Sequence, residues 1–551
     1  MPELSFFDAH CYIGRYKHLR PGGFYTKADL LAQMDHFGIA QALVLDAVSR
    51  ENHPDTGNLR VLEATHGEQR LYPAWALLPA RGGEIGEPGL LVPRLRTAGV
   101  GAVWMFPGTY TFALEQWCIG DVLAALEEGR VPLFIDPNTE FAGWGMDETD
   151  WDALVRLCRT FPNLSIVAAE GRMRSGNRMI YQALEACPNL HIELSGFWAH
   201  HGIEFVTREF GSHRLLFGTR MPVREVGGTM MQVKYADIPE ADQRNIAGEN
   251  LRRLLSRAFG NEEPEQGALR LVEDHEPPVQ FASEPIALPR PSGGELHEKV
   301  VDAASLEGET IIDFHGHLGS SKWYHIADGD MDSVYYEVKR FNVNRSVVFS
   351  FTVAAGDPEP GNDLITAAMM RYPRHFVGLC GVNPWHPGEM IAELERCWPL
   401  GFSGIKLIPH YQQYPETGEG IRQAVEWANE RNAIVLNHFW GPNDWLDELA
   451  RDYPNATLVT GHLNIEHAEV INRRGNVYLC TCEPLMYGQV ENMVTQVNVE
   501  KILFGSDISD LPIALGLGPI LHARISDEDK RKIIGGNAER LLERVLPGIR
   551  R

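Results

Sequence analysis

Residues 311–319 read IIDFHGHLG, and residues 6–14 read FFDAHCYIG. In both stretches a short apolar run leads into an Asp-x-His motif and ends on glycine. Five further stretches of the first half return in the second half in the same order: residues 99–108 as 401–410, 131–138 as 433–440, 161–171 as 453–463, 214–220 as 501–507, and 246–255 as 533–542. Because chance similarity would not keep six blocks in order, the sequence predicts a tandem duplication.

Short apolar runs alternate with helical patterns in both halves. ALVLDA and GAVWMF are typical of buried strands, whereas DALVRLCRTF and MIAELERCWPL carry apolar residues at helical spacing. This alternation predicts βαβ units and a parallel sheet, and no G-x-G-x-x-G follows an early strand to indicate dinucleotide binding. One (β/α)8 barrel needs about 250 residues. The 551 residues therefore predict an α/β fold of two tandem (β/α)8 TIM-like barrels, the first a degenerate copy.

The predicted domain boundaries follow the repeat. Residues 1–258 are expected to form a degenerate barrel without a metal site, and residues 309–551 the barrel that carries the active site. Between them, residues 259–308 contain the Pro- and Glu-rich stretches EEPEQ, DHEPPVQ and LPRPSGG. This composition predicts a linker without a core of its own.

The net charge of −24 at pH 7 argues against binding to nucleic acid or anionic membranes, because both are polyanions. No apolar run reaches the ~20 residues that span a bilayer, and the first residues lack the pattern of a signal peptide. The eight cysteines are scattered, which predicts reduced thiols in a cytoplasmic protein. Cys480 and Cys482 form a C-x-C pair in VYLCTC, interpreted as strand packing because no second pair lies nearby.

Two histidines leave one predicted strand in the same direction. Residues i and i+2 of a strand share a face, so His315 and His317 are placed to clamp a metal. Further strand-like runs end at His438, His462 and Asp507. In a parallel barrel all strand C-termini meet at one face, so three or four of these side chains can surround one cation. Neutral imidazoles and a carboxylate suit Zn²⁺, with Mn²⁺ or Fe²⁺ as alternatives.

The order H-x-H, Lys, His, His, Asp at successive strand ends resembles the amidohydrolase superfamily. The motif D-x-H-x-H-x-G, with a closing F-G-S-D and a final G-N-A-x-R-L-L, is similar to its amidohydrolase-2 (amidohydrolase-related) branch. The resemblance covers nearly all of residues 310–548 and, more weakly, residues 4–258. It implies a metal-dependent enzyme of a branch whose members more often hold one metal ion than two.

The resemblance also implies a role for each residue of the pattern. His315, His317 and Asp507 would ligate the metal, with His438 as a further ligand. His462 would be the catalytic histidine that polarises substrate or shuttles protons, or would ligate the second ion of a two-metal site. Asp507 would also be catalytic, because a carboxylate that touches both metal and water is placed to act as general base.

Residues after the other strand ends are candidates for substrate binding. Lys406 follows the GIKL run; in some superfamily members a lysine here is carboxylated and bridges two metals, but a plain ammonium that binds substrate is preferred. Loops after barrel strands line the pocket, so His410, Tyr411 and Trp440 are also predicted to bind substrate. Further candidates, by proximity only, are Tyr414, Asn464, His467 and Asp510.

The first half keeps Asp8 and His10 but replaces the other site residues: Tyr12 stands for His317, Trp104 for Lys406, Asp136 for His438, Glu170 for His462 and Arg220 for Asp507. A guanidinium at a ligand position repels a divalent cation. We therefore expect Arg220 to pair with Asp136 and Glu170 as a fixed internal cation. The rival interpretation is an oxygen-rich metal site on Asp8, Asp136 and Glu170.

The role of the first half has several interpretations. A purely structural domain is preferred. The alternative is a substrate or effector site in which His10, Tyr12 and Arg220 recognise an anion. The first half would also serve as a built-in partner subunit that covers the pocket of the second half. The two halves would then form an internal pseudo-dimer, and two such chains could pair into a homo-oligomer.

Three functions fit the ligand set of the second half. The first is hydrolysis of an amide, lactone or related carbonyl bond of a small molecule by activated water. The second is non-oxidative decarboxylation, or hydration, of a small carboxylate, because relatives use the same ligands for these reactions. The third is a non-catalytic binding or scaffold protein, against which the complete ligand set argues. GIKL resembles hydrolases of the branch, so hydrolysis is preferred.

Overall fold

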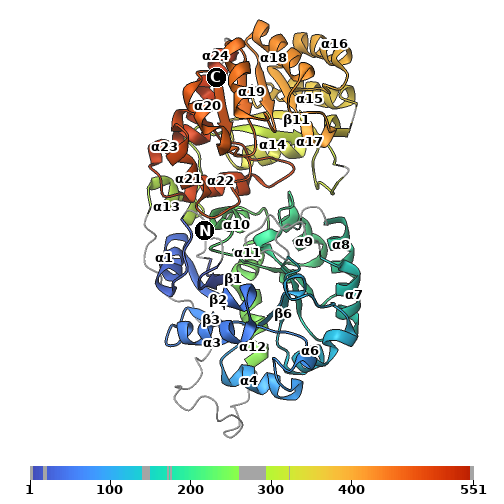
Figure 1. The fold of residues 1–551 in the computed structure, drawn as a ribbon, viewed down its shortest axis with the longest axis vertical. Coiled ribbons are helices and arrows are strands. Elements are labelled where there is room, and N and C mark those ends of the chain that lie inside the picture. The colour runs from blue at the N-terminus through green and yellow to red at the C-terminus, as the bar shows by residue number, and fades with distance from the viewer. Residues whose placement is uncertain are drawn as a thin grey trace. The chain divides into compact units, whose positions relative to one another are not determined.

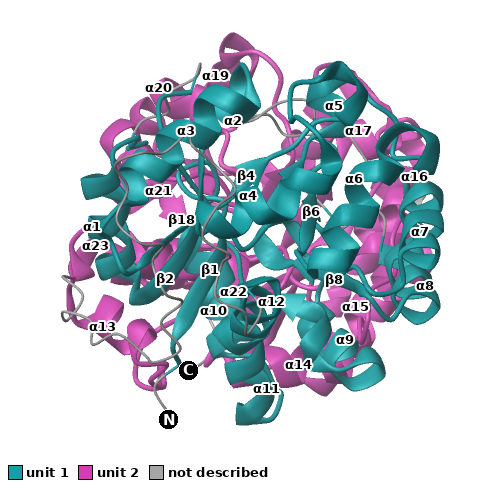
Figure 2. Cartoon of the chain, turned by 90° about the horizontal axis from the view of Figure 1, so that it is seen from below, with its two compact units in different colours: residues 1–292 teal, residues 293–551 magenta. Residues whose placement is uncertain are grey.

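A computed structural model of the chain describes residues 4–16, 22–138, 149–169, 173, 177–259, 293–321, 323–355 and 357–546. The chain divides into two compact units, Met1–Ser292 and Gly293–Arg551, called here the first and the second unit (Figure 2). In both units parallel strands alternate along the chain with helices (Figure 1). The predicted α/β class is therefore confirmed.

The strands of the first unit pair in chain order within two sheets, β1 to β3 and β4 to β9. They are β1 (Phe6–Ile13), β2 (Ile39–Asp46), β3 (Leu71–Pro73), β4 (Trp75–Ala76), β5 (Val103–Met105), β6 (Leu133–Ile135), β7 (Ile166–Ala168), β8 (Leu190–Glu193) and β9 (Leu215–Leu216). Only Ala74 separates β3 from β4. The Ala9 N–H donates to the Phe217 carbonyl (2.9 Å), which connects β1 to the residues after β9.

The strands of the second unit repeat this order, with sheets β10 to β12 and β13 to β18. They are β10 (Ile312–Leu318), β11 (Arg345–Ser350), β12 (Phe376–Gly378), β13 (Cys380–Gly381), β14 (Gly404–Leu407), β15 (Ile434–Asn437), β16 (Thr457–Thr460), β17 (Val477–Cys480) and β18 (Ile502–Leu503). The Phe314 N–H donates to the Phe504 carbonyl (2.7 Å), so β10 is bonded to the segment after β18.

Helices follow most strands. The first unit has α1 (Lys27–Phe37), α2 (Val48–Glu51), α3 (Pro54–Thr65), α4 (Leu91–Thr97), α5 (Pro107–Tyr110), α6 (Gln116–Gly129), α7 (Trp151–Thr160), α8 (Asn177–Ala186), α9 (Gly202–Phe210), α10 (Val226–Lys234), α11 (Glu240–Arg244) and α12 (Asn250–Phe259). The second has α13 (Glu295–Val301), α14 (Met331–Arg340), α15 (Glu359–Arg371), α16 (Pro387–Cys397), α17 (Pro409–Gln412), α18 (Glu419–Arg431), α19 (Asn443–Asp452), α20 (Ala468–Arg473), α21 (Gln489–Gln496), α22 (Ile513–His522), α23 (Asp527–Arg531) and α24 (Asn537–Val545).

The core of the second unit lies between strands and helices. In α24 the residues Ala538, Leu541 and Leu542 share one face, because they are three and four positions apart. They pack in one buried cluster with strand residues such as Leu436 and Val459. Apolar spacing therefore determines which side of the helix faces the sheet.

Two asparagine contacts show the duplication in the structure. Asn250 Nδ2 donates to the carbonyls of Ser212 and Leu215, and Asn537 Nδ2 donates to those of Val499 and Ile502. Each set ties the start of the last helix to the strand that closes its repeat. A second matched pair, Asn189 and Asn476, precedes β8 and β17. Each amide donates to three carbonyls of the helix and loop that precede the neighbouring strand, β7 or β16.

The end of the predicted linker belongs to the second unit. Within residues 259–308, helix α13 buries Leu296 and Val300, four positions apart on one face. Arg531 pairs with Glu295 (2.9 Å) and Glu309 (2.8 Å), which attaches this segment to α23. From Gly293 onward the chain therefore belongs to the second unit and not to a linker. The Pro- and Glu-rich composition gave no sign of the short amphipathic helix α13. Residues 260–292 lie outside the described residues.

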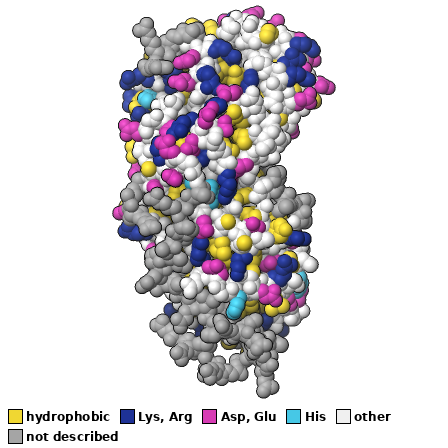
Figure 3. Space-filling model, turned by 90° about the vertical axis from the view of Figure 1, so that its left-hand side faces the viewer, with side chains coloured by type: hydrophobic (Ala, Val, Ile, Leu, Met, Phe, Trp, Pro, Cys, Tyr) yellow, Lys and Arg dark blue, Asp and Glu magenta, His cyan; other side chains and the backbone are white. Residues whose placement is uncertain are grey.

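Acidic and basic side chains intermingle over the face of the molecule seen in Figure 3. This pattern agrees with a sequence in which both signs are common despite the net charge of −24. Among the residues that the structure describes, no helix has the length and apolar character needed to cross a membrane.

Candidate metal centre

Two histidines of β10 and one aspartate meet in the second unit. His317 Nε2 lies 2.8 Å from Asp507 Oδ1, and His315 Nε2 lies 3.3 Å from the same oxygen. All three side chains are buried. The i, i+2 spacing directs both imidazoles toward Asp507, in agreement with the sequence pattern.

His438 and His462 lie beside this group. They follow β15 and β16, two neighbouring strands whose register pairs Asn437 with Thr460. Their Nε2 atoms are 3.1 Å apart. One ring nitrogen from each of His315, His438 and His462 lies within 4.8 Å of the others. The structure therefore brings together all the residues that the sequence proposed as ligands or catalytic groups.

Asp313 connects the strand that carries His315 to the segment that carries Asp507. Its Oδ1 accepts the N–H groups of His315 (3.0 Å) and Ser506 (2.9 Å), and its Oδ2 accepts the Ser506 hydroxyl (2.6 Å). These bonds tie β10 to the segment that carries Asp507. The sequence analysis assigned Asp313 no role, although the Asp-x-His motif in both repeats was a signal for one.

Burial controls protonation in the cluster. Desolvation lowers the pKa of His315 and of His438, and the nearby ammonium of Lys406 lowers both further. Both rings are therefore neutral near pH 7, which is the form that ligates metal. Burial also lowers the pKa of Lys406 to about 7, and its Nζ lies 3.2 Å from His315 Nε2.

The donor set fits a divalent cation. One ligand atom each from His315, His317 and Asp507 lies within 4.8 Å of the others. Neutral imidazoles with a carboxylate are ligands that Zn²⁺ and related cations prefer. His462 and Asp507 have left-handed backbone angles (φ 53° and 65°), which are uncommon in residues other than glycine and turn these side chains at their strand ends.

Aromatic residues border the cluster on one side. The rings of His410 and His438 have centroids 5.0 Å apart, and Tyr411 lies 5.8 Å from the same ring. Tyr411 also contacts Trp323 (4.7 Å). His410 is exposed and Tyr411 half-buried, so both predicted substrate residues lie next to the histidines with a side open to solvent.

Other predicted loop residues have structural partners. Trp440 is fully buried, and its indole N–H donates to the Val459 carbonyl (3.1 Å), so the structure gives it a packing role. Three others have hydrogen-bond partners: the Tyr414 hydroxyl accepts the Ile408 N–H (2.8 Å), Asn464 Nδ2 donates to the His438 carbonyl (2.9 Å), and His467 Nδ1 lies 2.7 Å from Asn443 Oδ1. Asp510 is buried.

The corresponding place in the first unit holds a buried ion-pair network. Arg220 Nη1 lies 3.1 Å from Asp136 Oδ2, and Arg50 Nη1 lies 2.7 Å from the same oxygen. The predicted pairing of Arg220 with Asp136 is confirmed, whereas Glu170 lies outside the described residues. Arg50 comes from α2 and was not predicted. Two guanidiniums thus contact Oδ2 of Asp136, one of the carboxylates that the rival metal-site interpretation needed.

Charges in this network balance. His10 keeps its place, with Nδ1 3.0 Å from Glu193 Oε2. Burial, with the charge of Arg220, lowers the pKa of His10 to about 4, so the ring is neutral at pH 7. Arg50 and Arg220 then face the carboxylates of Asp136 and Glu193. Among the described residues of this network, two guanidiniums are thus accompanied by two carboxylates with lowered pKa values.

Tyr12 and Trp104 fill the remaining space around His10. The Tyr12 hydroxyl lies 3.0 Å from His10 Nε2, and the Trp104 ring centroid lies 4.2 Å from that of His10. Asp8 accepts the N–H groups of His10 and Thr219 (both 2.9 Å), as Asp313 does in the second unit. The first unit thus keeps the scaffold of the site, but a tyrosine, a tryptophan and an arginine replace three side chains of the cluster found in the second unit.

Comparisons with known proteins found both solved structures and a family model that are similar to this chain. Three solved structures illustrate the matches: an uncharacterised TIM-barrel protein from Bordetella bronchiseptica (18% identity, 43% of this chain and 99% of that one, TM-score 0.37), 2,6-dihydroxybenzoate decarboxylase from Rhizobium (14%, 43%, 99%, 0.35) and 4-oxalomesaconate hydratase from Rhodopseudomonas palustris (19%, 43%, 98%, 0.34). A model of the amidohydrolase family (Amidohydro_2) matches residues 8–257 and again residues 312–544. Because these two matches cover most of the chain, it belongs to the amidohydrolase family.

Proposed function

We propose that the second unit is a metal-dependent hydrolase that uses activated water to cleave an amide, lactone or related carbonyl bond of a small molecule. The observation that carries this proposal is the convergence of His315 and His317 on one oxygen of Asp507. We also infer that each unit is a closed (β/α)8 barrel, whose strand C-termini meet at one face. The proposed cofactor is one zinc ion, with Mn²⁺ and Fe²⁺ as alternatives.

His315, His317 and Asp507 would hold the cation, with His438 as a further ligand. When bound, a divalent cation polarises a substrate carbonyl and lowers the pKa of a coordinated water to about 7. The Asp507 carboxylate would accept a proton from the attacking water. His462, whose Nε2 lies 3.1 Å from His438 Nε2, would hold a proton and pass it to the leaving group.

Three side chains are proposed to contact substrate. His410 and Tyr411 border His438 and are partly open to solvent. Lys406 reaches into the cluster, so its ammonium would bind a polar substrate group close to the reacting carbonyl. A carboxylated Lys406 that bridges two cations is the alternative. Trp440 is omitted because its indole is engaged in the core.

The first unit is proposed to be a degenerate copy with a structural role. Arg50 and Arg220 form ion pairs with the buried carboxylate of Asp136. Their charges would compensate this carboxylate in place of a metal ion, so the backbone of the site is kept.

A substrate screen with matched variants tests the proposal. Full-length protein reconstituted with zinc would be assayed on libraries of lactones, esters and amides. In Asp507→Asn we expect a loss of about 100-fold or more, because the general base is removed while the shape of the side chain is kept. Tyr12→Phe, at the matching place in the first unit, should keep full activity.

Two results would contradict the proposed reaction. Equal losses in Asp507→Asn and Tyr12→Phe would mean that the second unit does not hold the reacting groups. Release of CO₂ from carboxylate substrates, with no hydrolysis in the same screen, would replace the hydrolase with a decarboxylase.

A further inference from the structure

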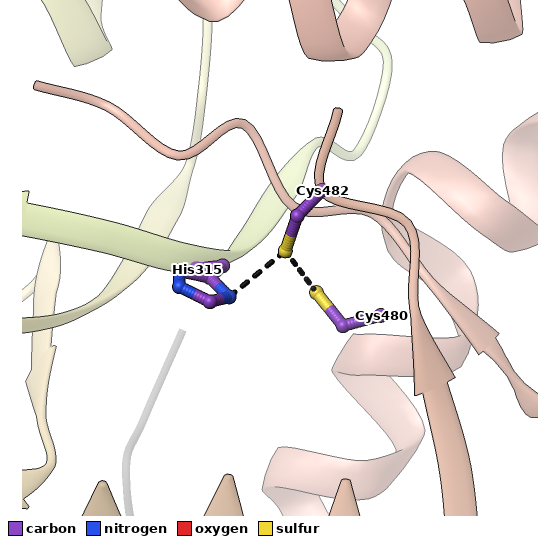
Figure 4. A group of neighbouring side chains, drawn as sticks. All are labelled: His315, Cys480 and Cys482. Atoms are coloured by element: carbon purple, nitrogen blue, oxygen red, sulfur yellow. Dashed lines mark hydrogen bonds between the residues drawn. The ribbon is translucent and has the colours of Figure 1, made fainter. Parts of the chain in front are cut away.

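The second ring nitrogen of His315 faces two cysteines. Its Nδ1 lies 2.8 Å from Cys482 Sγ, and Cys482 Sγ lies 3.3 Å from Cys480 Sγ (Figure 4). All three side chains are fully buried. The sequence analysis interpreted the C-x-C pair as strand packing, which does not account for a sulfur directed at a ligand histidine.

The segment after β18 leaves room for these sulfurs. A Cβ at Gly505 would lie 2.5 Å from Cys480 Sγ, 2.8 Å from Cys482 Sγ and 2.9 Å from His315 Cβ. Glycine at this position therefore allows the backbone to approach the cluster closely, which any other residue would prevent.

The first unit supports a specific role for this strand end. By the repeat, Glu193 and Ser195 stand where Cys480 and Cys482 stand. Glu193 Oε2 lies 3.0 Å from Nδ1 of His10, and the Ser195 hydroxyl donates to that carboxylate (2.6 Å). The same strand end thus presents a polar group to the same histidine nitrogen in both units, as oxygen in the first and as sulfur in the second.

We propose that Cys480, Cys482 and Nδ1 of His315 form a second metal site, selective for thiophilic cations such as Cd²⁺ or Cu⁺. Their three ligand atoms lie within 4.8 Å of one another. Thiolates and imidazole select soft or borderline cations over Mg²⁺, Ca²⁺ or Mn²⁺. On binding, each thiol releases its proton to solvent and its sulfur bonds the cation, so no oxidant or reductant is required.

This site competes with the proposed hydrolytic centre for one imidazole. A neutral histidine has one nitrogen with a lone pair and one that carries a proton. A cation on Nδ1 of His315 places the proton on Nε2, which then cannot join His317 and Asp507 as a ligand. A thiophilic cation would therefore switch off the hydrolase; this consequence, unlike the thiol site itself, rests on the proposed function.

A second thiol cluster in the same unit serves as a control. Cys380, Cys397 and Glu393 also lie within reach of one cation. The Glu393 oxygens already accept bonds from Arg396 (2.7 and 2.8 Å) and Asn362 (2.7 Å), so this carboxylate is engaged. We therefore expect Cys397→Ser to leave soft-metal binding unchanged.

Cadmium titration of the full-length, metal-free protein tests the site. Thiolate–cadmium bonds absorb in the near ultraviolet, and we expect this absorption to saturate at one Cd²⁺ per chain. It should disappear in Cys480→Ser and in Cys482→Ser and persist in Cys397→Ser, with folding checked by circular dichroism. Undiminished absorption in both of the first two variants would overturn the proposal.

X-ray absorption spectroscopy of the wild-type cadmium complex needs no variant. Two sulfur ligands are expected, and a shell of oxygen and nitrogen alone would overturn the proposal even if the serine variants do not fold.

Manganese release tests the shared imidazole. Wild-type protein is loaded with Mn²⁺, and free Mn²⁺ is followed by electron paramagnetic resonance as Cd²⁺ is added. We expect release to rise with the thiolate absorption, and the double variant Cys480→Ser, Cys482→Ser to keep its Mn²⁺ at the same Cd²⁺ concentration. Equal release from the double variant would contradict competition for His315. A wild type that never binds Mn²⁺ would refute the proposed function but not the thiol site.

Discussion

Replacing Asp136 by asparagine tests whether buried arginines stand in for a metal in the first unit. The substitution keeps the shape of the side chain but removes the charge that Arg50 (2.7 Å) and Arg220 (3.1 Å) share. All three side chains are at most 2% exposed, so water cannot replace the lost carboxylate. The two guanidiniums would then lose the carboxylate that they share: Arg220 would keep only the weaker interaction with the charge of Glu193, and Arg50 would lose its ion pair.

The expected loss is large. Removing one partner of a buried ion pair costs about 3–5 kcal/mol, and Asp136 serves two partners, so we expect about 5 kcal/mol. In a domain of this size each kcal/mol lowers the melting temperature by about 3 °C. The melting transition of the first unit should therefore fall by about 15 °C.

Differential scanning calorimetry of the full-length chain measures this shift. Asp447→Asn is a matched control, because Asp447 also binds two arginines, Arg473 (2.8 Å) and Arg474 (2.6 Å), but near the surface, where solvent screens the charges. Adding Arg220→Met to Asp136→Asn should recover about 1–3 kcal/mol, since one unpaired charge is removed. Equal, small shifts for the two asparagine variants would refute the reasoning.

Three further predictions concern stability. Burial lowers the pKa of His191 in the folded protein to about 3, whereas an unfolded histidine has a pKa near 6.5. As the pH falls, the unfolded state therefore binds the proton first. The free energy of unfolding of the first unit should fall by about 2 kcal/mol between pH 8 and pH 5 because of this group. Urea midpoints of wild type and His191→Phe at both pH values measure this, and an unchanged pH dependence in the variant would contradict it. Trp440→Ala should destabilise the second unit by about 3–5 kcal/mol in thermal melts, because it empties a fully buried site; a stable variant that has lost only substrate affinity would argue against the packing role. Gly404→Ala should cost about 3 kcal/mol, since its Cβ would lie 2.0 Å from the Ile434 carbonyl oxygen, whereas Gly388→Ala meets nothing within 4 Å and should be neutral in the same melts.

The fold and the strand-end residues could be predicted because they depend on patterns along the chain. Apolar runs of strand length, repeated in order, determine a parallel α/β arrangement. The i, i+2 spacing was sufficient to place His315 and His317 together, since strand geometry fixes that relation. The ends of parallel strands then brought His438, His462 and Asp507 to the same place.

Contacts made by side chains from distant or irregular segments could not be predicted. Arg50 reaches Asp136 from a short helix, and no spacing along the chain indicates that approach. Trp440 lies two residues after His438, yet its indole turns into the core and its N–H donates to the Val459 carbonyl. Rotamers and packing decide such positions, and a sequence pattern carries little information about either.

The structural surroundings of Cys480 and Cys482 also changed the interpretation of these cysteines. The sequence analysis interpreted the pair as strand packing; in the structure Cys480 ends β17, Cys482 follows it, and the two sulfurs lie 3.3 Å apart and so face the same side. Whether that face meets apolar side chains or His315 depends on the neighbouring strands, and the structure places His315 there. His315 and Cys482 lie 167 residues apart in the sequence, so no local pattern indicates that they meet.

Manganese content per chain tests most directly the central claim that the second unit alone carries the hydrolytic metal centre. Mn²⁺ is chosen because thiolates bind it weakly, so the cysteine site should not contribute to the measured content. After reconstitution and removal of free metal, wild type and Tyr12→Phe should hold about one ion per chain, and the double variant His315→Ala, His317→Ala should hold none. An ion that survives in the double variant, or no ion in wild type, would contradict the account.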